Sequence, residues 1–447
     1  MTLDEAVPYL VVLARCIFAP LFVMNIVPLL IWGERKGAAY IQDRPGPNRA
    51  HILGIRAAGL VHTLNDVVKL IVKEDIIPGH VNRFYWALAP VIAMSVALCT
   101  FIVVPFGDSF MGYQLKVSDI DGGLLFVLAL TSLGVYGVML AGWASNNKFS
   151  LMGGLRASAQ MVSYELAMGL SAVVVFLMSG TVSLSEIAAQ QGQPLNLFGL
   201  VEIPGFNWNV FSIPGFLAFI LFWVSAFAEC NRTPFDLPEG EAELVAGYHT
   251  EYSSLRFALF FMAEYANMIV ASAVTATLFF GGYNIPFLNG EALRAHADLL
   301  LMAAGGGAPL FLAFAYIAWQ RRLRPFYQAL PADDIRHREP KFWVVVWVGA
   351  ALAHLAIAGL GATGIVGSFE MGGYMIGQEV VALIAQVTAL AVKVLIGSWV
   401  FIWVRWTLPR FRYDQLMDLG WKRMLPVALF NVFLAAVWTI LFHSPTA

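Results

Sequence analysis

Four ionisable side chains occupy stretches of this sequence that are otherwise apolar. Glu165 lies in SAQMVSYELAMGL, Glu264 in FALFFMAEYANM, Glu229 at the end of WVSAFAE, and Lys393 in ALAVKVLIGSW. A charge at the centre of a membrane helix costs about 2.5–3.5 kcal/mol. Such residues are typical of a proton or ion pathway. A buried ion pair, or a side chain that reaches the membrane surface, gives the same pattern.

A second group of carboxylates is crowded into the polar segment 231–256. It contains Asp236, Glu239, Glu241, Glu243 and Glu251, beside Arg232. Neighbouring carboxylates disfavour each other's ionisation, so they titrate as a coupled set. The segment is therefore predicted to take up or release protons when a nearby charge changes. A solvated acidic surface is the alternative.

The elements that must position these residues are membrane helices. Hydrophobic residues make up 59% of the 447 residues and charged residues only 13%, about half the charge of a soluble domain. About 20 apolar residues cross a bilayer, and ten stretches meet that length: 8–32, 85–105, 122–142, 159–179, 213–230, 257–280, 299–319, 342–362, 380–404 and 424–442. The sequence predicts an all-α polytopic membrane protein with about ten transmembrane helices.

Lysine and arginine are concentrated in alternate loops. The loops 33–84, 143–158, 231–256, 320–341 and 405–423 hold 23 of the 27 basic residues. Basic loops stay in the cytoplasm, so both termini are predicted to be periplasmic, in a bacterial inner membrane. The net charge of −2 offers no case for nucleic-acid binding.

The first of these loops contains an amphipathic pattern. Leu60, Leu64, Val67, Val68 and Ile71 recur at helical spacing, which predicts a helix at the membrane surface or against a partner protein. Before it, the Pro45–Gly46–Pro47 sequence predicts a rigid turn.

Three long blocks resemble the H-subunit family of NADH–quinone oxidoreductases, the heel subunit of respiratory complex I. They are GERKGAAYIQDRPGPNR (33–49) with LVHTLNDVVKLIVKEDIIP (60–78), the whole of 227–268, and FIWVRWTLPRFRYDQLMDLGWKRMLP (401–426). The resemblance implies a membrane-arm subunit of a proton-translocating enzyme complex, which binds quinone at the interface with neighbouring subunits. The implied partners are the peripheral-arm quinone-reducing and iron–sulfur subunits and small membrane-arm subunits, besides membrane lipid.

The resemblance also implies roles for individual residues. Those that would line or shape the quinone tunnel are Glu34, Arg35, Arg44, Arg232, Phe235 and Asp236. Those that match the family's proton path are Glu165, Glu229, Glu239, Glu241, Glu243, Glu264 and Lys393. No complete catalytic site is expected in this chain, and no metal or iron–sulfur cluster, because its three scattered cysteines fall short of the usual four ligands.

Residues 285–378 depart from the family pattern of eight spans. They contain two further apolar stretches around a basic loop. We therefore divide the chain into a core of six helices (1–284), an inserted pair of helices (285–378) and the last two family-type helices (379–447).

Two other functions fit parts of the sequence. The membrane anchor of an energy-converting hydrogenase, or of a related ferredoxin-linked complex, would share the fold and parts of the first loop. A secondary ion transporter would also use many helices and intramembrane carboxylates, but the sequence shows no repeated half.

Overall fold

The structure, a computed structural model, describes residues 3–442 except for several short segments. The residues left out are 45, 119, 198–200, 204, 238–243, 321–322, 324–327, 330, 332–333, 335–336, 365–366, 368–369 and 372–373. The expected proton-path residues Glu239, Glu241 and Glu243, and the first proline of the predicted turn, therefore lie outside the described residues.

Every apolar stretch predicted from the sequence forms a helical segment. Among the described residues, nine segments are long enough to cross a membrane, and the tenth, α7, has 17 residues. The segments are α1 (Leu3–Ile41), α3 (Arg83–Thr100), α4 (Gly123–Ala144), α5 (Lys148–Ser179), α7 (Ile213–Glu229), α9 (Ser254–Phe279), α11 with α12 (Ala297–Ala304 and Ala308–Gln320), α14 (Arg338–Ala362), α15 (Ile376–Thr407) and α17 (Leu425–Phe442). The prediction of an all-α polytopic membrane protein is confirmed.

Shorter elements connect these helices. The helical ones are η1 (Ala57–Gly59), α2 (Val61–Val72), η2 (Phe101–Val103), α6 (Leu184–Gln191), η3 (Asn209–Phe211), η4 (Gly247–His249), α10 (Gly290–Ala295), η5 (Gly305–Gly307), α16 (Tyr413–Asp418) and the π-helical turn η9 (Leu419–Met424). The strands form antiparallel pairs: β1 (Ser109–Phe110) with β2 (Tyr113–Gln114), β3 (Leu195–Leu197) with β4 (Val201–Ile203), and β5 (Glu370–Met371) with β6 (Tyr374–Met375).

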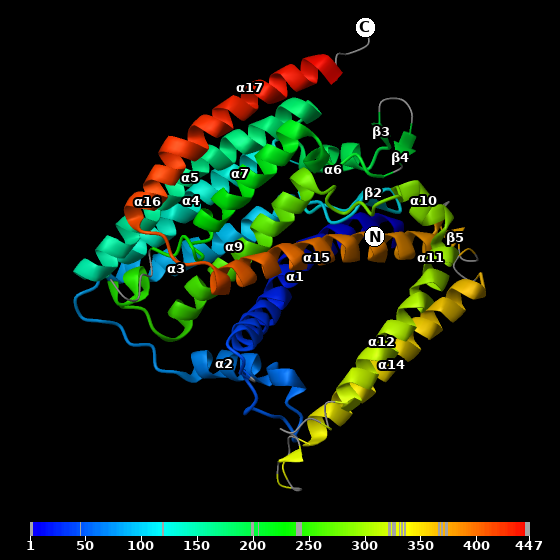
Figure 1. The fold of residues 1–447 in the computed structure, drawn as a ribbon, viewed down its shortest axis with the longest axis horizontal. Helices are drawn as coiled ribbons and strands as arrows, with labels where there is room; N and C mark the ends of the chain where they lie inside the picture. Colours follow the sequence, from blue (N-terminus) through cyan, green and yellow to red (C-terminus); the bar gives the residue numbers. More distant parts are fainter. Residues whose placement is uncertain are drawn as a thin grey trace.

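Helices α3, α4, α5, α7, α9 and α17 pack against one another as a bundle, and α1 and α15 cross it beside α9 (Figure 1). Small residues allow the closest approaches. A Cβ atom on Gly142 of α4 would lie 2.5 Å from the Ser150 carbonyl of α5, and Gly154 faces it. Such contacts are the usual basis of helix association in lipid, where apolar burial gives no driving force.

The five loops predicted on one side of the membrane contact one another in the structure. The contacts are Asn82 N–H to Ala144 O, Asn147 to Glu251, Asp236 to Arg410, and Arg56 to Glu339. The β-strand pairs belong to connections at the other ends of the helices. The alternation inferred from basic residues is thus consistent with the fold, whereas the compartment on each side remains a prediction.

Helix α2 is the amphipathic helix expected in the first basic loop. It packs beside α1 and α9, but its apolar stripe faces outward, because Leu64, Val67, Val68 and Ile71 are all about half exposed or more. The stripe is therefore available to lipid or to another protein.

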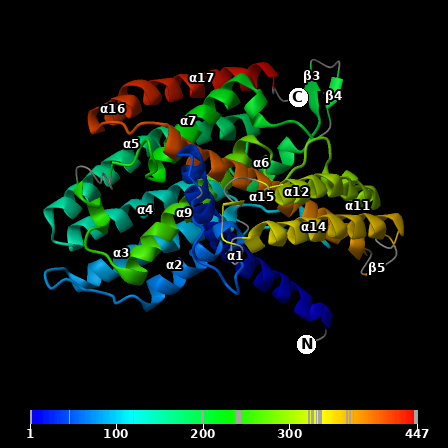
Figure 2. The same ribbon diagram turned by 60° about the horizontal axis from the view of Figure 1, so that its bottom comes forward.

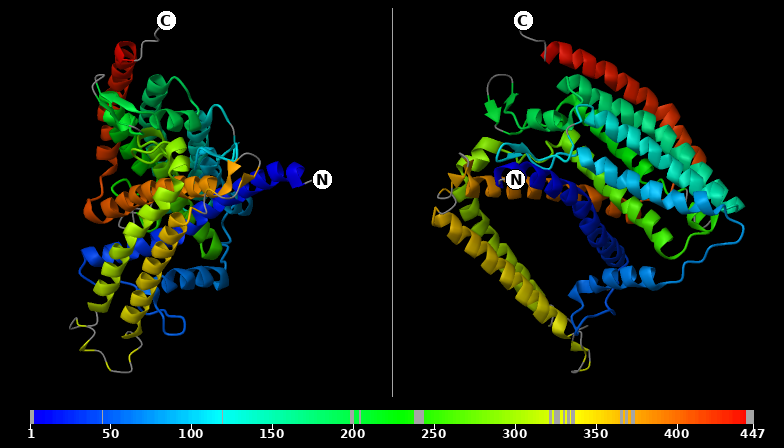
Figure 3. Two further views of the ribbon diagram at one scale, coloured as in Figure 1. Left: turned by 90° about the vertical axis from the view of Figure 1, so that its right-hand side faces the viewer. Right: turned by 180° about the vertical axis from the view of Figure 1, so that it is seen from behind.

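The described residues of 285–378, the region predicted from the sequence to be inserted, form a hairpin of two long apolar segments. In it, α11 and α12 run beside α14 (Figure 2). Seen from behind, the hairpin stands apart from the bundle, with one end near the start of α15 and the other near η1 (Figure 3). It therefore touches the rest of the chain mainly at its two ends.

Candidate functional site

Glu34 is the centre of a buried ionic cluster at the basic side of the bundle. It lies near the C-terminal end of α1 and is only 6% exposed. One carboxylate oxygen accepts a hydrogen bond from Arg405 of α15 at 2.6 Å, and the other accepts from the Tyr265 hydroxyl of α9 at 2.6 Å. A buried charge requires such partners, because its transfer out of water is otherwise too costly.

Arg232 joins Glu34 to a second carboxylate. It follows α7 in the third basic loop and is 2% exposed. Its Nη1 lies 3.3 Å from Glu34 and its Nη2 lies 3.7 Å from Glu264 of α9. The guanidinium also lies over the Tyr265 ring, 4.2 Å from the ring centroid. Two arginines and two carboxylates thus form one cluster, in which Arg232 contacts both carboxylates.

Glu264 is the member of the cluster that borders the interior of the bundle. Its Oε1 accepts a hydrogen bond of 3.0 Å from the Tyr248 hydroxyl of η4. The position of Tyr248 depends on Gly153 of α5, where a Cβ atom would lie 2.8 Å from the backbone of Gly247. Glycine at this position therefore lets η4 approach α5 and directs the hydroxyl to the carboxylate.

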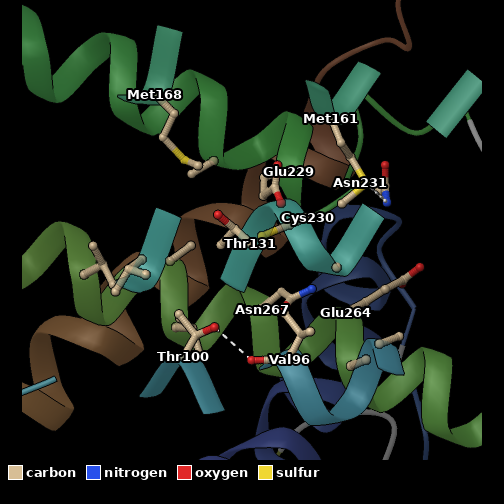
Figure 4. A pocket seen from close by; sticks show the side chains of 18 of the residues that line it. Val96, Thr100, Thr131, Met161, Met168, Glu229, Cys230, Asn231, Glu264 and Asn267 are labelled. Carbon is tan, nitrogen blue, oxygen red and sulfur yellow. Dashed lines mark hydrogen bonds between the residues drawn. The ribbon is translucent and has the colours of Figure 1, made fainter. Parts of the chain in front are cut away.

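Glu264 borders a cavity that is lined mostly by apolar side chains. This cavity has a volume of about 60 Å³, which is enough for a few water molecules. Glu229, Thr131 and Asn267 gather around it, with Glu264 at its edge (Figure 4). The Oε2 atom of Glu229 is buried and has no hydrogen-bond partner among the described residues. Water in this cavity would supply that partner.

Glu165 is a neighbour of Glu229. It belongs to α5, is half-buried, and accepts a hydrogen bond from Ser132 of α4. It is close enough to Glu229 for the two carboxyl groups to interact electrostatically. Arg232 therefore links Glu34 to Glu264, the cavity is shared by Glu264 and Glu229, and Glu229 is a neighbour of Glu165.

The Phe235–Asp236 pair joins the third basic loop to the last one. Asp236 is 5% exposed and pairs with Arg410 at 2.8 Å. Phe235 packs between the rings of Tyr164 and Phe411. This second contact fixes the loop that carries Arg232.

Three predicted residues lie apart from this cluster. Arg35 and Arg44 are exposed on the first loop, where Arg35 pairs with Asp66 of α2 and Arg44 bonds to Gln42. Lys393 lies near the opposite end of α9, because it donates to the carbonyls of residues 280, 282 and 284 at 2.6–2.8 Å. Sixteen residues of helix separate this site from Glu264, a rise of about 24 Å.

Sequence reasoning missed several members of the site. Arg405, Arg410, Tyr248 and Tyr265 complete its ionic and hydroxyl contacts. All four lie inside the blocks that carried the family resemblance, and that was their only signal. Among the described residues, no cluster of three or more histidine, cysteine or acidic side chains could hold a metal ion.

Comparison with known proteins shows which family the chain belongs to. A family model described as NADH dehydrogenase matches residues 14–436. The H subunit of the NADH-quinone oxidoreductase of Flavobacterium psychrophilum is 40% identical over 415 residues, covering 92% of each chain. The chain belongs to the H-subunit family of NADH-quinone oxidoreductases. The NADH-quinone oxidoreductase subunit 8 of Rhodothermus marinus is 40% identical, with 93% of each chain covered. An H subunit of the enzyme of Solibacter usitatus is 40% identical over 98% of this chain and 99% of its own.

Membership of the H-subunit family decides between the functions that the sequence left open. The relatives described above carry names of quinone oxidoreductase subunits, and the similarity extends over more than nine tenths of the chain. This finding favours the complex I function over a hydrogenase anchor or an independent ion transporter.

Proposed function

We propose that this chain is the membrane-arm subunit that couples quinone reduction to proton translocation in a complex I type NADH-quinone oxidoreductase. The family supports the enzyme, and the buried cluster supports the coupling. The observation that carries the proposal is the position of Arg232, shared between Glu34 at the basic side and Glu264 at the internal cavity.

The quinone would bind on the basic side, where the first, third and last loops meet. Glu34 of the first loop contacts Arg232 of the third, and Asp236 of the third loop contacts Arg410 of the last. The internal cavity of about 60 Å³ holds only a few water molecules and is too small for a quinone. Neighbouring subunits would therefore complete the quinone tunnel, and they would also supply the electrons.

Coupling would proceed by redistribution of charge within the cluster. Two unit charges about 4 Å apart interact by about 4 kcal/mol at the effective dielectric typical of protein sites. A change of charge on a quinone beside Glu34 would therefore change the relative strength of the two ion pairs that Arg232 forms, one with Glu34 and one with Glu264. A proton could then move through cavity water to Glu229 and on to Glu165.

Lys393 has a different role in this proposal. Its ammonium group binds three carbonyls that follow α9 and lies 4.8 Å from the centroid of the Trp208 ring. A cation at a helix C-terminus is favourable because the carbonyl ends there carry partial negative charge. We therefore assign Lys393 to fixing the end of α9, whose centre holds Glu264.

The test is proton pumping by the assembled complex in proteoliposomes. Glu264→Gln keeps the shape of the side chain and a carbonyl acceptor for Tyr248, so the complex should assemble while the number of protons pumped per electron falls. Glu186→Gln is the matched control, because Glu186 is an exposed residue of α6 at the other end of the bundle. A Glu264→Gln complex that pumps as the control does would refute the coupling role.

The proposed orientation places the basic loops in the cytoplasm and both termini in the periplasm. It rests on the 23 basic residues that gather in one set of loops. A cysteine introduced at exposed Arg44 should react with an impermeant maleimide only in inside-out vesicles. Reaction in right-side-out vesicles alone would reverse the orientation.

A further inference from the structure

The first basic loop has an unusually strained backbone. Asp43, Leu53, Ala57 and Ala58 all have positive φ angles, between 44° and 53°. Side chains other than glycine rarely adopt this conformation, and it persists only where surrounding contacts hold it. The loop therefore requires anchors, and their positions show what controls its shape.

Several anchors come from the loop and its neighbouring helices. The Trp32 indole of α1 donates to the Ala58 carbonyl at 3.0 Å, and His62 of α2 accepts from the backbone N–H groups of residues 49 and 50. Gly59, at φ +96°, lies so close to the chain that a Cβ atom would be 2.4 Å from the Pro47 carbonyl. These contacts fold the loop back on itself.

One further anchor comes from the inserted hairpin. Arg56 is 4% exposed, donates to the Asn48 carbonyl at 2.9 Å, and forms an ion pair with Glu339. Glu339 lies in the first turn of α14, and its side chain is 14% exposed. Loss of one partner from such a buried pair leaves an uncompensated charge, which is strongly unfavourable.

The other end of the hairpin is fixed independently. Arg294 of α10 pairs with Glu379 of α15 at 2.8 Å and with Asp108 at 3.4 Å. Within the hairpin, Gly361 of α14 packs so closely on α11 that a Cβ atom would lie 2.6 Å from the Asp298 carbonyl. The hairpin thus contacts α15 at one end and the first basic loop at the other (Figure 3).

We propose that Arg56 and Glu339 are positioning residues for quinone binding, through which the inserted hairpin holds the first basic loop in its strained shape. The proposal rests on the proposed function, in which Glu34 and this loop border the quinone site. Trp32, which bonds to the loop beside Arg56, lies two residues before Glu34 on α1. A loop released from Glu339 would therefore shift the basic end of α1.

The experiment uses the assembled complex with Glu339→Gln, Glu339→Asp and Arg56→Lys. For Glu339→Gln, the KM for a short-chain quinone should rise roughly tenfold, as for one lost charged hydrogen bond. Its kcat, and its NADH oxidation with ferricyanide as acceptor, should stay near wild type. Glu339→Asp keeps the charge and should recover most of the quinone affinity. Lys341→Gln is the control, because it removes an exposed charge from the same turn of α14.

Two results would overturn the inference. An unchanged quinone KM in assembled Glu339→Gln complex would show that the hairpin does not position the site. Loss of complex from the membrane in all three variants would make the pair a folding element. Failure of the coupling role would give a different result. Glu264→Gln would then pump protons normally, while the quinone KM of Glu339→Gln would still rise.

Discussion

Replacing Arg232 with glutamine removes the guanidinium that lies between Glu34 and Glu264. At 3.7 Å, its attraction to Glu264 is about 4 kcal/mol at an effective dielectric of about 20. Removal of one partner from a buried pair costs about 3–5 kcal/mol, so the two figures agree. We expect Arg232→Gln to destabilise the complex by that amount.

Arg405→Gln provides the matched comparison. It removes the other arginine of the cluster, but the Arg405 side chain is 25% exposed against 3% for Arg232. Because Arg405 is partly exposed to water and Glu34 keeps Arg232 and Tyr265 as partners, Arg405→Gln should cost less than Arg232→Gln. The double variant Arg232→Gln with Glu264→Gln should regain stability, since it removes the uncompensated carboxylate as well.

The assay is the thermal transition of the detergent-solubilised complex, together with its yield on native gels. Arg232→Gln should lower the transition temperature by several degrees, more than Arg405→Gln does. The reasoning is refuted if Arg232→Gln is as stable as the wild type, or if adding Glu264→Gln lowers its stability further.

Two other predictions concern residues at opposite ends of the bundle. Burial lowers the pKa of His62 below its usual 6.5; Asp66 opposes this effect, and Arg35 and Lys36 add to it. The neutral ring therefore stabilises the first loop above about pH 6.5, and this contribution is lost as the pH falls through the lowered pKa. Quinone reductase activity should then decrease on the acid side of its pH profile, and this decrease should be smaller in His62→Gln. A pH profile unchanged in His62→Gln would exclude this role. Lys393→Met loses three carbonyl contacts and should cost about 1–3 kcal/mol of stability without changing the protons pumped per electron; a lower ratio in assembled enzyme would return Lys393 to the proton path.

Much of the fold could be predicted because a membrane helix is a local property of sequence. Every apolar stretch of about bilayer length became a helical segment, including the two in the inserted region. The ends were less predictable. Helix α1 continues to Ile41 and α5 begins at Lys148, because helices extend beyond the apolar core into polar sequence, where hydropathy gives no signal.

The carboxylates of the site could be found from sequence, but their partners could not. A glutamate in an apolar run is conspicuous by itself. By contrast, Glu34 and Arg405 are 371 residues apart, and Arg56 meets Glu339 across most of the chain. Such pairs depend on the crossing of α1 and α15 and on the length of the hairpin. A single sequence contains no record of either.

In the proposed coupling, Glu229 and Glu264 act in series at one small cavity between the helices. Protons pumped per electron should be measured for Glu229→Gln, Glu264→Gln and the double variant, each as assembled complex in proteoliposomes. Groups in series give non-additive effects. The double variant should therefore pump as many protons per electron as the single variant that pumps fewer. Losses that multiply in the double variant, or full pumping by either single variant, would contradict the account.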